Sequence, residues 1–240
     1  MPDDDFVPGR LLTRRQILAL LGASGAALLA GRAGAAAPAA AGIPACVARP
    51  RQTEGPFFVA GDLERSDLRS DPSTGAVVPG SPLRLEFRVS RAGASGCAPL
   101  TGAQVHVWHC DAAGNYSSVR DRNASTAGEA FLRGFQTTDA AGVARFVTIY
   151  PGWYPGRAVH LHFKIRTEDA TRRAEFTSQL YFDDALSARV YAAAPYAARG
   201  RPELSNSDDF LFRDGGRQLL LDVAADDRGY AAVFAIGLQG

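Results

Sequence analysis

The chain has 240 residues, of which 46% are hydrophobic and 21% are charged, and its formal net charge is +1 at pH 7. This composition is typical of a folded globular chain and excludes a largely disordered one. The near-zero net charge and the lack of a basic block argue against nucleic acid as a partner. The length suits one domain of ordinary size with tails.

The N-terminus predicts a targeting segment rather than part of the fold. Arg14 and Arg15 precede an apolar run from Ile17 to Ala30, and an alanine-rich region with candidate cleavage sites follows. The run is short and broken by glycine, which is too weak for a stable membrane span of about 20 residues. It also lacks the alternation of an amphipathic helix. We therefore expect a twin-arginine signal at residues 1–41, read by the export machinery, and a periplasmic or extracellular domain at residues 42–240.

The chain contains three cysteines, Cys46, Cys97 and Cys110. In an oxidising compartment, one disulfide and one free thiol is the simplest arrangement, and three pairings are open. Cys46 and Cys97 lie in loop-like stretches that a cross-link would stabilise, so this pair is favoured. Cys110 follows an apolar strand and is expected to be a buried small hydrophobic residue.

Short strand patterns separated by turn sequences run through the rest of the chain. Strands are expected at residues 83–89, 103–110, 131–137, 143–150, 160–166, 176–182, 219–223 and 230–236. A long loop is expected at residues 62–82 and a turn at 93–99, while residues 183–198 have a helical composition. Many short strands without a convincing long helix predict an all-β fold, a single β-sandwich of mostly antiparallel strands with long loops.

The most informative stretch runs from Tyr150 to Arg166. Two Pro-Gly pairs hold Tyr154 on a tight loop. In the strand that follows, alternate residues share a face, so His160 and His162 point the same way, roughly 6.5–7 Å apart along the strand. Imidazoles at that spacing can bind one metal ion. The alternative is two polar residues on a solvated strand face.

A second tyrosine, Tyr116, follows a turn sequence and completes a set of four candidate ligands with Tyr154, His160 and His162. Phenolate oxygen is a hard, anionic donor, which favours iron(III). The set has no thiolate or carboxylate, so zinc and calcium fit it less well. Either tyrosine could instead be a core residue whose hydroxyl is hydrogen-bonded.

These residues resemble the intradiol ring-cleavage dioxygenases, the catechol and protocatechuate dioxygenases that use non-haem iron(III). The most specific element of the resemblance is the ordered pattern Tyr…Tyr-x-x-Arg-x-x-His-x-His. The matching segments are residues 53–56, 107–117, 134–139, 150–162 and 178–182, and the likeness covers roughly residues 46–236.

The resemblance implies a β-sandwich with the iron between its sheets. It implies two equatorial ligands, Tyr116 and His162, and two axial ligands, Tyr154 and His160, with water or hydroxide as the fifth. An incoming catechol would displace Tyr154, which can accept a proton, and O₂ would cleave the ring between the two hydroxyl groups to give a cis,cis-muconate. Arg157 would stabilise the charge that develops on the ring, and Gln179 would support the site from its strand.

Two departures from the family pattern bear on the substrate. Only Pro155 and Gly156 separate Tyr154 from Arg157, where well-known members carry a longer insertion that helps to form the pocket wall. No long N-terminal helical segment precedes the sandwich, so the chain is more similar to an exported, dioxygenase-like branch. Which catechol is cleaved is therefore open, and so is the oligomeric state.

Two rival functions remain at this point. One is a non-catalytic, exported binding module with the same β-sandwich fold. The other is a copper or zinc hydrolase that uses His160 and His162. For the remaining candidate residues, His106 and His109 are expected to be structural, and Phe57 and Trp153 to line the pocket or pack in the core. The pairs Asp183-Asp184 and Asp208-Asp209 are expected to be solvated.

Overall fold

The computed structural model describes residues 46–61, 63–93, 96–120, 125–168 and 173–239. The expected twin-arginine signal lies outside these residues. The signal, its export machinery and the periplasmic or extracellular location therefore stay predictions. No helix in the described part of the chain is long and apolar enough to cross a membrane.

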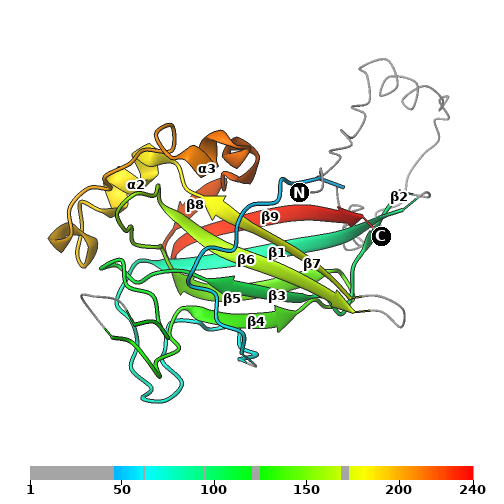
Figure 1. Ribbon diagram of the computed structural model, residues 1–240, viewed down its shortest axis with the longest axis horizontal. Helices are drawn as coiled ribbons and strands as arrows, with labels where there is room; N and C mark the ends of the chain where they lie inside the picture. Colours follow the sequence, from blue (N-terminus) through cyan, green and yellow to red (C-terminus); the bar gives the residue numbers. More distant parts are fainter. Residues whose placement is uncertain (1–45, 62, 94–95, 121–124, 169–172, 240) are drawn as a thin grey trace, which may run out of the picture. The chain divides into compact units, whose positions relative to one another are not determined.

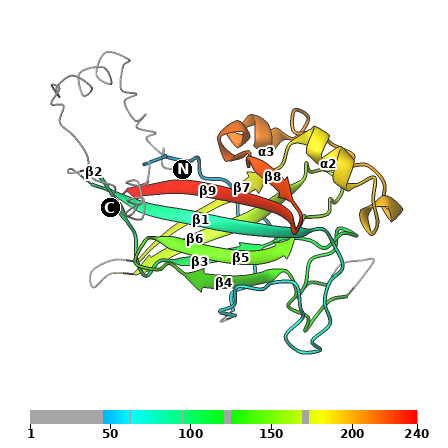
Figure 2. The ribbon, with the colours of Figure 1, turned by 180° about the vertical axis from the view of Figure 1, so that it is seen from behind.

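The described residues form two sheets that pack as a sandwich (Figures 1 and 2). One sheet has the strand order β2-β1-β9-β8, with β5 paired to β1, and comprises β1 (Pro82–Gly93), β2 (Gly96–Pro99), β5 (Val143–Ile149), β8 (Val223–Asp226) and β9 (Gly229–Gln239). The other has the order β4-β3-β6-β7 and comprises β3 (Gln104–Trp108), β4 (Arg133–Thr137), β6 (His160–Glu168) and β7 (Arg173–Tyr181). The strand pairs are antiparallel except β1 with β9, which is parallel. This architecture confirms the predicted all-β sandwich.

Short helices connect the two sheets between β7 and β8, at one end of the sandwich (Figures 1 and 2). They are α2 (Asp184–Val190), η1 (Tyr196–Ala198), α3 (Phe210–Arg213) and η2 (Gly216–Leu219). The helical composition of residues 183–198 is confirmed by α2 and η1. The strand expected at residues 219–223 is wrong, because the apolar run enters the core through the turn of η2 and the strand begins only at Val223. Periodicity alone does not separate a short buried strand from a buried helical turn.

The core between the sheets follows from the two-residue repeat of the strands. Leu85 and Phe87 of β1 are buried and face Leu161 and Phe163 of β6 in one hydrophobic cluster. The rings of Phe87 and Phe163 lie 5.3 Å apart between centroids. Burial of each such side chain contributes roughly 1.5–3 kcal/mol. The packing of this cluster therefore determines which face of β6 points into the core and which points away from it.

A disulfide joins Cys46 to Cys97 across a sequence separation of 51 residues, with 5.6 Å between their Cα atoms. Cys110 is free and buried, so the favoured pairing is confirmed. Residues 93–99 are not a simple turn, because Gly96–Pro99 forms β2 and pairs with the end of β1. The disulfide thus links the start of residues 46–58 to this hairpin. These residues begin against β9 and continue past β7 to Trp108 of β3, and we call them the covering segment.

Removal of the disulfide by the double substitution Cys46→Ser and Cys97→Ser is expected to lower the free energy of unfolding by roughly 2–5 kcal/mol, because the unfolded chain loses a cross-link across a long loop. Urea unfolding of oxidised native protein and of the double variant measures the difference. Dithiothreitol should destabilise the native protein and leave the double variant unchanged. Equal unfolding midpoints for the two proteins would contradict the prediction.

Candidate active site

His160 and His162 lie on the face of the β4-β3-β6-β7 sheet that is turned away from the other sheet. Their neighbours Leu161 and Phe163 fill the core, so the alternation of β6 directs both imidazoles outward. Both histidines are nevertheless buried, with 2% and 1% of their surface exposed. The expectation that the site lies between the sheets is therefore wrong. It lies beneath loops that cover the outer face of one sheet.

The two imidazoles converge, with 3.2 Å between their Nε2 atoms. The Nδ1 atom of His160 lies 2.7 Å from the carbonyl oxygen of Ala158. Because a carbonyl only accepts, this contact assigns the proton to Nδ1 and leaves a lone pair on Nε2. The ring of Trp108 stacks on His162 at 5.1 Å with an interplanar angle of 8°, which holds that imidazole in place.

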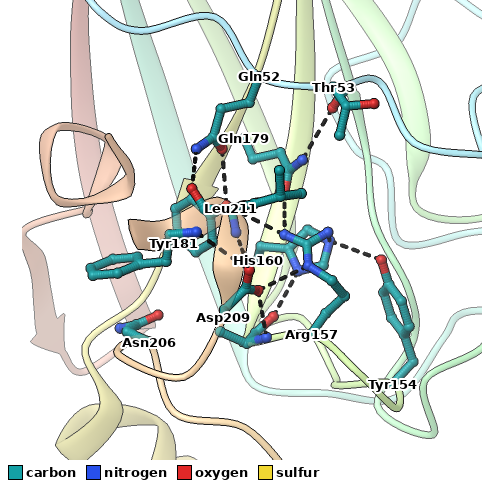
Figure 3. A network of polar contacts seen from close by, with 12 residues as sticks. Gln52, Thr53, Tyr154, Arg157, His160, Gln179, Tyr181, Asn206, Asp209 and Leu211 are labelled. Atoms are coloured by element: carbon teal, nitrogen blue, oxygen red, sulfur yellow. Dashed lines mark hydrogen bonds and ion pairs between the residues drawn. The ribbon is translucent and has the colours of Figure 1, made fainter. Parts of the chain in front are cut away.

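Both predicted tyrosines reach this cluster from loops. The Tyr154 hydroxyl lies 3.1 Å from His160 Nε2, and Figure 3 shows the two side chains directed at each other. Tyr116 follows a turn in which Asp111 Oδ1 accepts the backbone N–H of Asn115 at 2.8 Å. Its ring lies 5.7 Å from that of Tyr154 and is buried. The Tyr116 hydroxyl forms no hydrogen bond of normal geometry with any described residue. A buried hydroxyl in this state is poised to meet a partner from outside the chain.

Removal from water favours the neutral form of all four side chains. Burial and then the positive charge of Arg157 lower the pKa of His160 to about 3, and burial and then His160 place the pKa of His162 well below its usual range. Burial raises the pKa of Tyr154 to about 12, although Arg157 opposes the shift, and burial raises the pKa of Tyr116 well above its usual range. Neutral imidazoles can bind a metal, whereas the phenols would ionise near neutral pH only with a metal ion bound, because Arg157 alone does not offset the effect of burial.

The arrangement fits one metal ion. Two nitrogen ligands about 2.1 Å from one ion and at right angles to each other are roughly 3 Å apart, close to the observed 3.2 Å between the two Nε2 atoms. No group of three or more His, Cys, Asp or Glu side chains that could hold a metal occurs among the described residues. The side chains that converge here are phenolic and imidazole groups, and such a donor set would suit a hard trivalent ion.

Arg157 lies beside the cluster and is fixed from two sides. Its Nε donates to Asp209 Oδ2 at 2.8 Å and its Nη2 donates to Gln179 Oε1 at 2.6 Å. The remaining nitrogen, Nη1, lies 3.5 Å from His160 Nε2 (Figure 3). Burial opposes the charge, but Tyr154 and Asp209 keep the pKa of Arg157 above its usual value. The site therefore contains a fixed cation directed at the cluster.

Gln179 connects Arg157 to the covering segment. Its Nε2 donates to the carbonyl oxygen of Thr53 at 3.1 Å. The neighbouring Tyr181 hydroxyl donates to Gln52 Oε1 at 2.9 Å, and Gln52 in turn donates to the carbonyl oxygen of Leu211 at 2.6 Å. The predicted position of Gln179 beside the site is thus observed, and its amide links the strand, Arg157 and the covering segment.

Asp209 is the site residue that sequence reasoning missed. The expectation that Asp208-Asp209 is solvated is wrong for Asp209, which is completely buried. Its Oδ1 accepts the N–H of Leu211 at 2.8 Å as the N-cap of α3. An Asp before an apolar pair is a recognisable capping signal, but the pairing with Arg157 spans 52 residues and leaves no local trace.

The other two histidines, His106 and His109, are expected to be structural, and within the described part of the chain only His109 of the two has hydrogen-bond partners on both ring nitrogens. His109 Nε2 lies 2.7 Å from Thr148 Oγ1, and its Nδ1 lies 2.9 Å from the carbonyl oxygen of Cys110. His106 is buried, and its ring packs 4.9 Å from that of Phe135.

Phe57 and Trp153 have different surroundings. The ring of Phe57 stacks on Tyr116 at 4.3 Å, at the border of the site. Trp153 belongs to the core, and its Nε1 donates to the carbonyl oxygen of Gly200 at 3.1 Å. A cavity of about 250 Å³ opens between the two tyrosine loops and is lined by Phe57, Gly114, Asn115, Tyr116, Val119, Thr126, Tyr154 and Pro155.

Comparison with known proteins decides the family. A model of the dioxygenase family matches residues 53–211. The chain is 34% identical over 165 residues to the protocatechuate 3,4-dioxygenase beta chain of Burkholderia cepacia, and the match covers 64% of this chain and 68% of that protein. The chain belongs to the intradiol ring-cleavage dioxygenases. This membership confirms the resemblance and makes the protein an enzyme of the oxidoreductase class.

Solved structures of dioxygenases share the fold. The intradiol ring-cleavage dioxygenase of Tetranychus urticae superposes with a TM-score of 0.71 at 25% identity, over 81% of this chain and 95% of that one. The dioxygenase domain of a carbohydrate-binding fusion protein from Streptomyces sp. SirexAA-E gives 0.54 at 30% identity, over 80% and 99%. Catechol 1,2-dioxygenase from Pseudomonas arvilla C-1 gives 0.53 at 28% identity, over 80% and 62%. The intradiol fold thus extends over the described sandwich.

Gly55 of the covering segment provides a test of how closely this segment packs on the dioxygenase site. It has φ +69°, and a Cβ placed there would lie 3.1 Å from His162 Cε1. Gly75 has φ +72° with open space around it. Both Gly55→Ala and Gly75→Ala should cost about 1–2 kcal/mol through the left-handed backbone. Gly55→Ala should lower the free energy of unfolding by more than this, because its Cβ also crowds His162, and it should lower ring-cleavage activity. Gly75→Ala should do neither. Urea unfolding measures the stability and oxygen uptake measures the activity. Equal stability and equal activity of the two variants would contradict a close contact between Gly55 and His162.

Proposed function

We propose that this dioxygenase holds iron(III) with Tyr116, Tyr154, His160 and His162. It cleaves a catechol-type ring between its two hydroxyl groups with O₂ and yields a cis,cis-muconate. The observation that supports this most is the convergence of a buried phenol, a half-buried phenol and two buried imidazoles, with His160 Nε2 at 3.1 Å from the Tyr154 hydroxyl and 3.2 Å from His162 Nε2. Family membership independently supports a small aromatic substrate and O₂ as reactants.

When bound, iron(III) supplies the positive charge that ionises the phenols and the electron-accepting centre that makes a bound catechol reactive toward O₂. The protein's own contribution begins with the tautomer of His160. Its Nδ1–H is engaged by the carbonyl oxygen of Ala158, so Nε2 stays available as a ligand.

Tyr154 has the position of a proton acceptor. It lines the 250 Å³ cavity and its hydroxyl oxygen touches His160, so it borders both the space for the substrate and the ligand cluster. In its ionised form, Tyr154 Oη can take the proton that a catechol hydroxyl gives up on binding.

Arg157 and Phe57 complete the site. The Nη1 group of Arg157 faces the cluster and stabilises negative charge that develops on a substrate oxygen, because a fixed cation in a buried site needs no reorganisation. Phe57 stacks on Tyr116, which removes water from that side of the cluster and offers an aromatic wall to the substrate ring.

Purified protein is expected to contain iron and to be red-brown, with a broad blue-green absorption band from tyrosinate-to-iron(III) charge transfer. It should consume one O₂ per catechol and form a product with muconate absorbance. Removal of iron should abolish colour and turnover, and iron(III) should restore both. Metal analysis, oxygen uptake against a panel of catechols and ultraviolet spectra check these outcomes. A colourless protein that stays inactive after iron loading would favour the binding module, and zinc or copper in the isolated protein would favour the hydrolase.

Tyr154→Phe is expected to shift or weaken the charge-transfer band and to lower kcat by about 100-fold, because it removes both an anionic ligand and a proton acceptor. Tyr150→Phe is the matched control. Tyr150 is buried more completely than Tyr154, and its hydroxyl pairs with Ser187 Oγ at 2.8 Å, so this variant should keep the native band and kcat. Visible spectra and oxygen uptake give both readouts. A Tyr154→Phe variant with the native band and rate would exclude the assigned role.

A further inference from the structure

The carboxylate of Asp209 makes four hydrogen bonds in a fully buried position. Oδ2 accepts Arg157 Nε at 2.8 Å and the backbone N–H of Ala158 at 2.9 Å. Oδ1 accepts the N–H groups of Leu211 at 2.8 Å and Phe212 at 3.3 Å. One oxygen therefore caps α3, and the other faces the segment between Tyr154 and β6.

The contact with Ala158 reaches the proposed iron ligand His160. The N–H of Ala158 donates to Asp209, and the carbonyl oxygen of the same residue contacts His160 Nδ1 at 2.7 Å. The N–H and the carbonyl group of Ala158 lie in the peptide planes on either side of its Cα, so anchoring the N–H restrains the position of the residue from which the carbonyl group projects. That carbonyl in turn sets the tautomer and the rotation of the His160 ring, as the hydrogen-bond partner of a metal-ligating histidine generally does.

The contact with Arg157 sets the direction of its charge. A guanidinium is planar and rigid, so fixing two of its nitrogens determines where the third one points. Asp209 holds Nε, and Gln179 holds Nη2. Nη1 is then left facing His160, at 3.5 Å from its Nε2 atom. Figure 3 shows Arg157 between Asp209, Gln179 and His160.

We propose that Asp209 is a positioning residue for ring cleavage, which acts through Arg157 and through Ala158 on His160. This inference rests on the proposed function, because it gives Arg157 and His160 the roles assigned there. Asp209 itself does not need to touch the substrate. Its carboxylate couples the α3 segment, which lies more than 50 positions further along the chain, to two groups of the reaction centre.

The test compares Asp209→Asn, Asp209→Glu and the control Asp183→Asn. Asparagine is a good N-cap, so Asp209→Asn keeps the cap of α3 and removes the charge. Asp209→Glu keeps the charge but moves it by one methylene. Asp183 caps α2 through the N–H of Leu186 at 2.8 Å, so Asp183→Asn reports on capping alone. Each iron-loaded variant is assayed for kcat and KM with catechol and O₂, for its charge-transfer band and for its iron content.

Both Asp209 variants are expected to keep iron, to shift the charge-transfer band and to lower kcat about 10- to 100-fold, with a smaller change in KM. Asp183→Asn should stay within about two-fold of the native kcat. In an Arg157→Ala background, Asp209→Asn should lower kcat by a clearly smaller factor than in the native protein, because residues that act through one another are not additive.

An Asp209→Asn variant with the native kcat and the native charge-transfer band would overturn the inference. So would an equal loss of kcat in the native and Arg157→Ala backgrounds together with an unshifted band. If Asp209→Asn does not fold, Asp209→Glu decides, and a native kcat in that variant overturns the inference. A native protein without colour or oxygen uptake would contradict the proposed function itself. An active native protein with an unaffected Asp209→Asn variant would contradict only the role of Asp209.

Discussion

The packing of β6 against the opposite sheet is the constraint on which the site depends. Leu161 and Phe163 are completely buried in the core with Phe87. A strand that places these side chains inward must place His160 and His162 outward. A slip of one residue would bury two imidazoles in the apolar core and expose large hydrophobic groups, at a cost of several kcal/mol. The same core packing therefore stabilises the sandwich and places the two histidines.

Because His160 and His162 point away from the core, they are shielded from water only if other segments pack over them. Loops from distant parts of the chain provide this shielding. The covering segment contributes Phe57, which stacks on Tyr116. The turn after Tyr154 returns the chain to β6, and α3 closes the side where Arg157 lies. A rigid strand thus sets the positions of the imidazoles, while loops supply the phenols and the walls, a common division of labour in binding sites.

The polar network around Arg157 explains how a charge is kept in this covered site. Asp209 neutralises the guanidinium, and Gln179 satisfies a second edge of it. A buried cation without such partners would be strongly destabilising. The partners come from β7 and from the N-terminus of α3, so placing this charge requires the complete fold, and the third nitrogen, Nη1, faces His160.

The sequence by itself determined what depends on near neighbours. Two-residue alternation predicted the strands and the shared face of His160 and His162, turn chemistry predicted the loops of Tyr116 and Tyr154, and loop-like surroundings favoured the Cys46–Cys97 pair. Tertiary structure alone decided that the site lies outside the sandwich and that Asp209 is buried against Arg157. The physical reason is that periodicity shows which residues share a face of a strand. Which other parts of the chain pack on that face depends on long-range contacts.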